Sequence, residues 1–210
     1  MEIIPVINCH DEESASELAK KAGEFSEWVH LDVSDARFTF NKSWGDSSVW
    51  PKFGKNLNLE VHLMVEEPEK EIDAWIKAGA KRIIVHAEAV NAEIVSGIKK
   101  KTDSADIKLM LAINPETPAE KLKLYFDEIA EFQILAVYPG PSGQKFRMLC
   151  TDKIRFLRRE MPNVIIEVDG GINEETAKLV KEAGADIAVS ASYIFGSPDP
   201  KSAYEKLKSI

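Results

Sequence analysis

The chain alternates regularly between short apolar runs of strand length and amphipathic segments of helix length. We expect strands at residues 3–8, 28–33, 59–64, 82–86, 107–113, 132–137, 164–168 and 186–189. Helical segments are expected at 13–22, just after Asp46, and at 68–78, 91–100, 118–126, 151–159, 174–183 and 200–207. A closed (β/α)8 barrel needs this number of units and about this length. The pattern therefore predicts an α/β fold, a TIM barrel formed by one domain over residues 1–210. An open doubly wound sheet is the alternative, but no G-x-G-x-x-G motif opens the first helix.

The composition agrees with one domain and limits the classes of partner that the protein can bind. The 210 residues are 44% hydrophobic, with no Pro/Gly/Ser-rich linker, and the net charge of −8 argues against nucleic acid or an acidic membrane as partner. An acid near the amino terminus and the lack of a membrane-length apolar run predict a cytoplasmic protein. Cys9 and Cys150 have no spacing that indicates a disulfide or a thiolate zinc site.

Imidazoles and carboxylates stand at the ends of three of the expected strands. His30 and Asp32 alternate in W-V-H-L-D-V and must share one face, His62 lies in E-V-H-L-M, and Asp169 ends an apolar run. In a TIM barrel the carboxyl ends of the strands form the functional face. Each residue alone is better explained as a structural histidine or a loop cap. Together they predict a site for one divalent ion, Zn²⁺ in first place, with Mn²⁺, Fe²⁺ or Co²⁺ as alternatives.

Glycine-bearing loops predict a phosphate site at the same face. Gly170 and Gly171 follow Asp169, residues 138–146 follow the sixth strand, and residues 191–196 follow the eighth. Barrels often bind phosphate there with a short extra helix, which residues 192–195 would supply. The alternative is that these glycines only form tight turns. His86, with Glu88 nearby, is equally compatible with a structural role, a contact to substrate or a contact to a metal ligand.

Six motifs, taken together, resemble one known family. They are V-H-L-D-V at 29–33, V-H-L-M-V at 61–65, L-A-I-N-P-E-T-P at 111–118, P-G-x-x-G-Q-K-F at 139–146, V-D-G-G-I-N at 168–173 and I-F-G-S-P-D-P at 194–200. The chain resembles the ribulose-phosphate 3-epimerases, and their relatives that act on allulose 6-phosphate, across essentially its full length.

The resemblance implies an isomerase that inverts C3 of a ketose phosphate, converting D-ribulose 5-phosphate to D-xylulose 5-phosphate in the pentose phosphate pathway. It implies a metal held by His30, Asp32, His62 and Asp169, with both aspartates as catalytic acid and base through a metal-stabilised enediolate. It also implies homo-oligomers. With the loop argument, it assigns substrate contacts to Cys9, Met64, Gly140, Ser142, Gly143, Gly170, Gly171, Ala191 and Ser192.

The metal and acid/base residues match the family, whereas positions near the substrate depart from it. The departures are Asn8 for leucine, Cys9 for serine, Ser34 and Leu135 for methionines, Ala36 and Ala191 for glycines, and Pro141 and Ser142 in the loop after the sixth strand. They leave open a 3-epimerase of another ketose phosphate, such as allulose 6-phosphate, or a barrel that binds sugar phosphate without turnover. A decarboxylase of the D-x-K-x-x-D type is disfavoured because the stretch 32–37 has no lysine, and no motif specifically indicates a zinc hydrolase.

Overall fold

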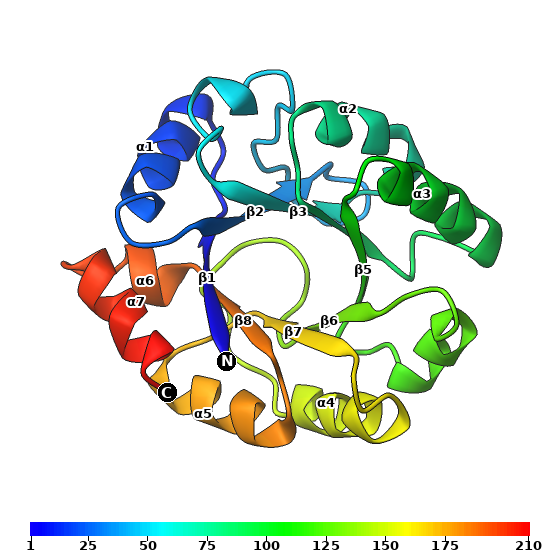
Figure 1. The fold of residues 1–210 in the computed structure, drawn as a ribbon. Coiled ribbons are helices and arrows are strands. Elements are labelled where there is room, and N and C mark those ends of the chain that lie inside the picture. The colour runs from blue at the N-terminus through cyan, green and yellow to red at the C-terminus, as the bar shows by residue number, and fades with distance from the viewer.

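The computed structural model describes all 210 residues and forms a closed barrel of eight parallel strands, as the alternation predicts. The strands are β1 Glu2–Ile7, β2 Trp28–Ser34, β3 Asn58–Met64, β4 Arg82–His86, β5 Lys108–Ile113, β6 Glu131–Leu135, β7 Ile165–Asp169 and β8 Ile187–Ser190. Each strand pairs with the next along the chain, and β8 closes the ring on β1 (Figure 1). The single-domain (β/α)8 prediction is confirmed in its architecture.

Helices surround the barrel, and several begin at residues that favour a helix start. The α-helices are α1 Glu12–Ala22, α2 Ile72–Lys77, α3 Ala92–Ser104, α4 Leu149–Glu160, α5 Glu174–Ala183, α6 Ser192–Phe195 and α7 Pro200–Lys208. Asn173 caps α5 in a capping box with Thr176, and Gly184 ends that helix in the left-handed conformation, at φ 110°. The short extra helix expected at 192–195 is α6.

Three expected helices are 3₁₀ helices in whole or in part, so these predictions were wrong in type. The segment after β5 is η3 Ala119–Tyr125, the segment after β3 divides into η2 Pro68–Lys70 and α2, and only η1 Trp50–Lys52 lies between β2 and β3. The connection between β2 and β3 contains S-W-G-D-S-S at 43–48, and these residue types favour turns over helix. The loop after β2 reaches the site, where the ring of Phe38 lies 4.6 Å from that of His86.

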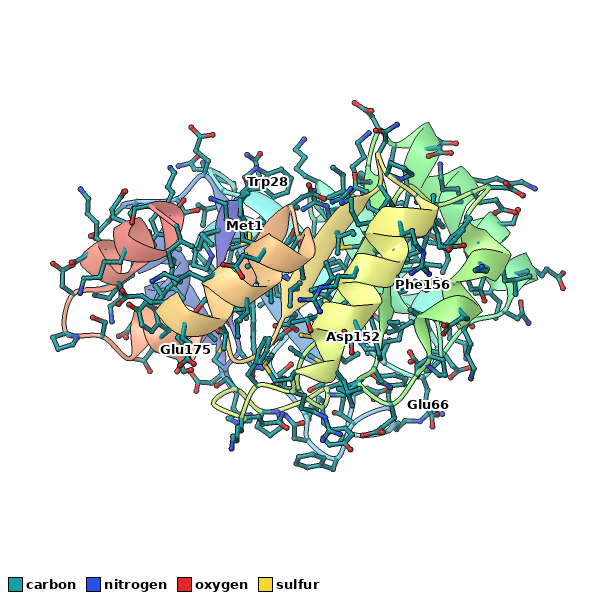
Figure 2. The ribbon with its side chains drawn as sticks, turned by 90° about the horizontal axis from the view of Figure 1, so that it is seen from below. Met1, Trp28, Glu66, Asp152, Phe156 and Glu175 are labelled. Atoms are coloured by element: carbon teal, nitrogen blue, oxygen red, sulfur yellow. The ribbon has the colours of Figure 1, made fainter.

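The hydrophobic core lies mainly between the strands and the helices. One cluster of 47 buried residues fills this layer, which Figure 2 shows from the side with α4 and α5 in front. Trp28, at the start of β2, and Glu66, just after β3, mark the two ends of the barrel in that view. The barrel interior differs, because its apolar clusters are small and a polar layer occupies the rest. No helix of the structure has the length and apolar character that crossing a membrane requires.

Candidate metal and substrate site

Strand register brings the four expected ligand residues together inside the barrel mouth. Asp32 on β2 is aligned with His62 on β3, and Asp169 ends β7. The Asp32 Oδ1 atom lies 3.1 Å from His30 Nε2 and 3.0 Å from His62 Nδ1, and Asp169 Oδ2 lies 3.6 Å from His62 Nδ1. One ligand atom from each residue falls within 4.8 Å of all the others.

These distances and charges fit a divalent ion. A tetrahedral Zn²⁺ with bonds of about 2.0 Å would hold neighbouring ligand atoms roughly 3.3 Å apart, close to the contacts among Asp32, His62 and Asp169. Burial and the neighbouring Asp32 charge raise the pKa of Asp169 to about 7, and a cation between the two carboxylates would favour the ionised form of both. The donor set is that of a transition-metal site.

The two histidines differ in their electrostatics. Burial would lower the pKa of His30, but hydrogen bonds and charges from Asp32 and Glu60 outweigh it and raise that pKa well above its usual value. For His62, burial dominates and lowers the pKa to about 4. Burial would likewise raise the pKa of Asp32, but the hydrogen bonds from both imidazoles hold it below its ordinary value. His62 is therefore a neutral imidazole with a lone pair available to a metal.

A second buried layer supports His30 from the interior side. Its Nδ1 atom lies 2.7 Å from Glu60 Oε1, and Arg82 Nη1 donates to Glu60 Oε2 at 2.5 Å and Nε to Glu131 at 2.7 Å. Glu167 lies nearby, its pKa raised well above the usual value by burial and by Glu60. Arg82 already neutralises Glu60, and His30 directs Nε2 toward Asp32 and the four-residue cluster. This second layer therefore needs no ion of its own.

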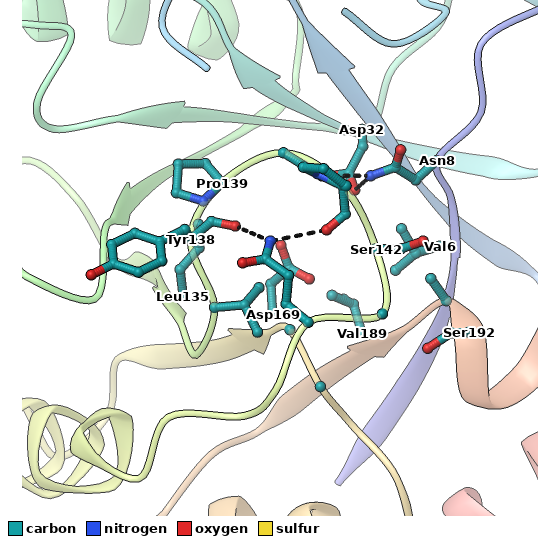
Figure 3. Close-up of a pocket in the computed structure, with 18 of the residues that line it drawn as sticks. Val6, Asn8, Asp32, Leu135, Tyr138, Pro139, Ser142, Asp169, Val189 and Ser192 are labelled. Atoms are coloured by element: carbon teal, nitrogen blue, oxygen red, sulfur yellow. Dashed lines mark hydrogen bonds between the residues drawn. The ribbon is translucent and has the colours of Figure 1, made fainter. Parts of the chain in front are cut away.

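A cavity lined by 20 residues opens above the ligands. Of the nine residues expected to contact substrate, eight line it: Met64, Gly140, Ser142, Gly143, Gly170, Gly171, Ala191 and Ser192. Asp32 and Asp169 form part of its floor (Figure 3). The side chains of His30 and His62 are fully buried beneath.

The structure does not bring Cys9 to this cavity. Its buried side chain belongs to the core outside the barrel, with the thiol 3.5 Å from the carbonyl of Asp11. Val6 and Asn8 line the cavity in its place. Side chains alternate along β1, so residues 6 and 8 face inward while 7 and 9 face outward. This alternation could have shown that the side chain of Asn8, and not that of Cys9, faces the cavity.

The loop 138–146 extends across the mouth and is held there by side-chain amides. Asn8 Nδ2 donates to Asp32 Oδ2 at 2.8 Å and to the carbonyl of Gly140 at 3.0 Å, while Gln144 Nε2 donates to two carbonyls within the loop (Figure 3). In Figure 1 the loop appears as the yellow-green arc over the barrel centre. Asn8 thus joins a carboxylate of the floor to the loop that covers it.

The segments after β7 and β8 offer backbone donors to the cavity. The N–H groups of Gly171 and Ser192, two residues that line the cavity, have no acceptor within the protein. Gly170 and Gly171 have φ values of 109° and 66°, and a Cβ on Gly171 would lie 2.9 Å from Phe146 Cβ, so glycine is required for this turn. Ala191 has φ −99°, a value open to any residue, so its methyl group brings no backbone strain.

The remaining departures from the family pattern have local explanations. Ser34 replaces a thioether with a hydroxyl that accepts from the Ser43 N–H at 2.9 Å, while Ser43 Oγ accepts from the Ser34 N–H and donates to the carbonyl of Asp32. This pair ties the loop after β2 to the strand end. Ala36 stands where glycine is usual and has φ 59°, the left-handed region. Leu135 is buried in a small apolar cluster inside the barrel.

Comparison with known proteins agrees with this geometry. The family model described as "Ribulose-phosphate 3 epimerase family" matches residues 2–195. The ribulose-phosphate 3-epimerase of Bacillus subtilis is 37% identical over 190 residues, covering 86% of this chain and 85% of that protein. That of Chlamydia muridarum is 39% identical over 176 residues, covering 80% and 75%. A crystal structure of 3-hexulose-6-phosphate synthase shares the fold at a TM-score of 0.75 and 20% identity, covering 100% of this chain and 99% of that one. The chain belongs to the ribulose-phosphate 3-epimerase family.

Proposed function

We propose that this enzyme inverts C3 of D-ribulose 5-phosphate to give D-xylulose 5-phosphate, with a divalent ion held by His30, Asp32, His62 and Asp169. One observation carries the proposal: two carboxylates from strands on either side of β8 and β1 meet two imidazoles under the cavity at the barrel mouth. Inversion at one carbon requires a base on one face and an acid on the other. We assign these two roles to Asp32 on β2 and Asp169 on β7.

The two carboxyl groups differ in their environment in a way that suits paired proton transfer. Without metal, hydrogen bonds from both imidazoles keep Asp32 ionised, whereas burial and the nearby negative charge favour a proton on Asp169. When the imidazoles turn their lone pairs to a metal, Asn8 still donates to Asp32, and the ion would supply the positive charge beside it. In one direction the first takes the C3 proton and the second returns one to the opposite face; in the other direction the roles exchange. A bound divalent ion would supply positive charge beside the developing oxyanion, which a carboxylate base alone cannot offset.

The far end of the cavity would take the phosphate group. The unpaired N–H groups of Gly171 and Ser192 offer donors without any positively charged side chain. An acidic protein can bind an anionic metabolite with such backbone donors. The loop 138–146 would then close over the sugar between the phosphate and the two carboxylates.

We propose Zn²⁺ as the native ion, with Mn²⁺, Fe²⁺ and Co²⁺ as alternatives that the same ligand set accommodates. Allulose 6-phosphate is the alternative substrate, because five of the changed residues line the cavity and none is a proposed ligand: Asn8, Leu135, Pro141, Ser142 and Ala191. We further expect a cytoplasmic enzyme that forms homo-oligomers; light scattering after size-exclusion chromatography measures the latter.

The test is turnover of ribulose 5-phosphate and of allulose 6-phosphate by protein stripped of metal and refilled with each ion, together with exchange of the C3 hydrogen with solvent. Turnover of ribulose 5-phosphate restored by metal supports the proposal, and preference for allulose 6-phosphate would replace its substrate. Metal binding with neither turnover nor exchange would indicate a barrel that binds sugar phosphate without catalysis.

A further inference from the structure

Behind His62, on the side away from the ligand cluster, two further side chains continue in a line. His62 Nε2 lies 2.9 Å from His86 Nε2, and the two rings are nearly coplanar, at an angle of 17°. His86 Nδ1 lies 3.4 Å from Glu88 Oε2. His86 is fully buried, and the ring of Phe38 covers it at 4.6 Å. No residue of this line except His62 belongs to the proposed metal site.

The geometry determines which nitrogens carry hydrogen when His62 is a ligand. The His62 Nδ1 atom faces Asp32 and Asp169, so it must present its lone pair there, and the hydrogen of the neutral ring is then on Nε2. That N–H points at His86 Nε2, which must therefore be an acceptor. His86 then carries its own hydrogen on Nδ1, directed at the Glu88 carboxylate.

Glu88 is fixed for this role by two donors from the loop after β5. Its Oε1 atom accepts the N–H of Asn114 at 2.8 Å and the hydroxyl of Thr117. These contacts leave Oε2 to His86. Burial would raise the pKa of Glu88, but its hydrogen bonds, that from His86 first, lower it to about 2, so the carboxylate is an acceptor only.

We propose that His86 and Glu88 are positioning residues that hold His62 in the tautomer able to bind the metal. The inference rests on the metal site proposed above and adds to it a role for two residues that touch neither metal nor substrate. Outer-shell partners of ligand histidines of this kind typically contribute 10- to 100-fold to metal affinity. His30 has a similar arrangement without an intervening histidine, because Glu60 accepts directly from its Nδ1 atom.

The first test is a direct observation of tautomers. The chain has four histidines, so ¹⁵N-labelled histidine in the zinc-loaded protein gives a small set of ring-nitrogen signals, which His10→Gln and His86→Gln help to assign. We expect hydrogen on Nε2 of His62 and on Nδ1 of His86. Hydrogen on Nε2 of His86 in the zinc-loaded protein would overturn the inference.

The second test is zinc affinity, measured by competition with a chromophoric chelator and not by activity. In Glu88→Gln, Asn114 and Thr117 retain the side-chain oxygen, so the amide NH₂ faces His86 and favours the wrong tautomer. We expect affinity to fall at least tenfold. Glu93→Gln, an exposed change at the start of α3, is the matched control and leaves affinity unchanged.

A third comparison separates positioning from packing. His86→Leu keeps a buried apolar side chain but removes the acceptor, whereas His86→Gln places a side-chain oxygen near the position of Nε2. We expect the glutamine variant to recover most of the zinc affinity that the leucine variant loses. Equal affinity in the wild type, Glu88→Gln and His86→Leu would overturn the inference and leave the metal site standing; failure of the wild type to bind zinc would overturn both.

Discussion

The floor of the site and its rim are built differently. The floor, formed by His30, Asp32, His62 and Asp169, lies on strands, and these four side chains are at most 15% exposed. The rim consists of loops 35–49 and 138–146 and exposes Phe40 at 79% and Tyr138 at 43%. His30, Asp32 and His62 have polar partners on neighbouring strands, whereas the rim is held by a few amide and hydroxyl contacts.

Most departures from the family pattern follow the same division, and Leu135, buried at the end of β6, is an exception. The four floor residues match the family motifs, while Ala36, Pro141 and Ser142 lie in the rim, and Ser34 and Asn8 lie where the two parts meet. A change in the floor disturbs several buried charges at once, but a change in a loop disturbs few contacts. We therefore expect the floor residues, which would carry out the reaction, to tolerate few substitutions. We expect the loop residues, which would contact the rest of the substrate, to tolerate more.

The comparison is tested most strongly at Asp169. Asp169→Asn keeps the shape of the floor but removes a proton-transferring group, so we expect kcat to fall by about 100- to 10,000-fold. Bound metal is measured in the same samples, because this residue is also a proposed ligand. Asp152→Asn, exposed on α4, is the control. Full turnover by the Asp169→Asn variant with metal bound would remove Asp169 from the acid/base pair.

Glu60 tests whether the floor is one network. Glu60→Gln leaves Arg82 and His30 without their shared carboxylate, and breaking such a buried pair costs about 3 kcal/mol or more. Urea unfolding of the metal-free protein measures this loss. Glu160→Gln breaks only exposed ion pairs and should change the free energy of unfolding by less than about 1 kcal/mol. Equal effects of the two changes would mean that the floor is not specially coupled.

The floor was accessible from sequence because it depends on local rules. Alternation along a strand predicts that His30 and Asp32 share a face, and parallel strands place their carboxyl ends at one edge. The same rule, applied to E-V-H and E-V-D, would also have found Glu60 and Glu167 beside their ligand partners. The strands and the long helices, such as α5 at residues 174–183, were likewise predicted closely.

The rim was less accessible because it depends on contacts between distant loops. Nothing near Gly140 in the sequence indicates that its carbonyl meets Asn8, which lies 132 residues away. Cys9 was chosen from its place in a motif, whereas the direction of its side chain depends on the register of β1 in the closed barrel. The 3₁₀ geometry of the segment 119–125 was also missed, because amphipathic spacing does not distinguish the two helix types.

Asn8 sharpens the comparison because it joins floor and rim. Asn8→Leu restores the residue usual in the family but removes the donor to both Asp32 and the Gly140 carbonyl. A hydrogen bond of this kind is worth roughly 1 to 2 kcal/mol, so we expect kcat/KM to fall about tenfold. Separate kcat and KM values show which part is affected: a loss confined to KM assigns Asn8 to the loop, and a loss confined to kcat assigns it to Asp32. No change in either would mean that the bridge has no functional role.

Ala36 gives the smallest expected effect and tests the rim alone. A non-glycine residue at φ 59° destabilises the folded state by about 1 kcal/mol. Glycine removes this strain, but its greater freedom stabilises the unfolded chain and offsets part of the gain. Ala36→Gly should therefore raise the free energy of unfolding by about 0.5 kcal/mol, with kcat unchanged. Ala105→Gly, at φ −102°, should lower it, because there glycine brings only the entropic cost. If both substitutions destabilise the protein, the left-handed turn at residue 36 is not strained, and this departure from the family carries no cost in stability.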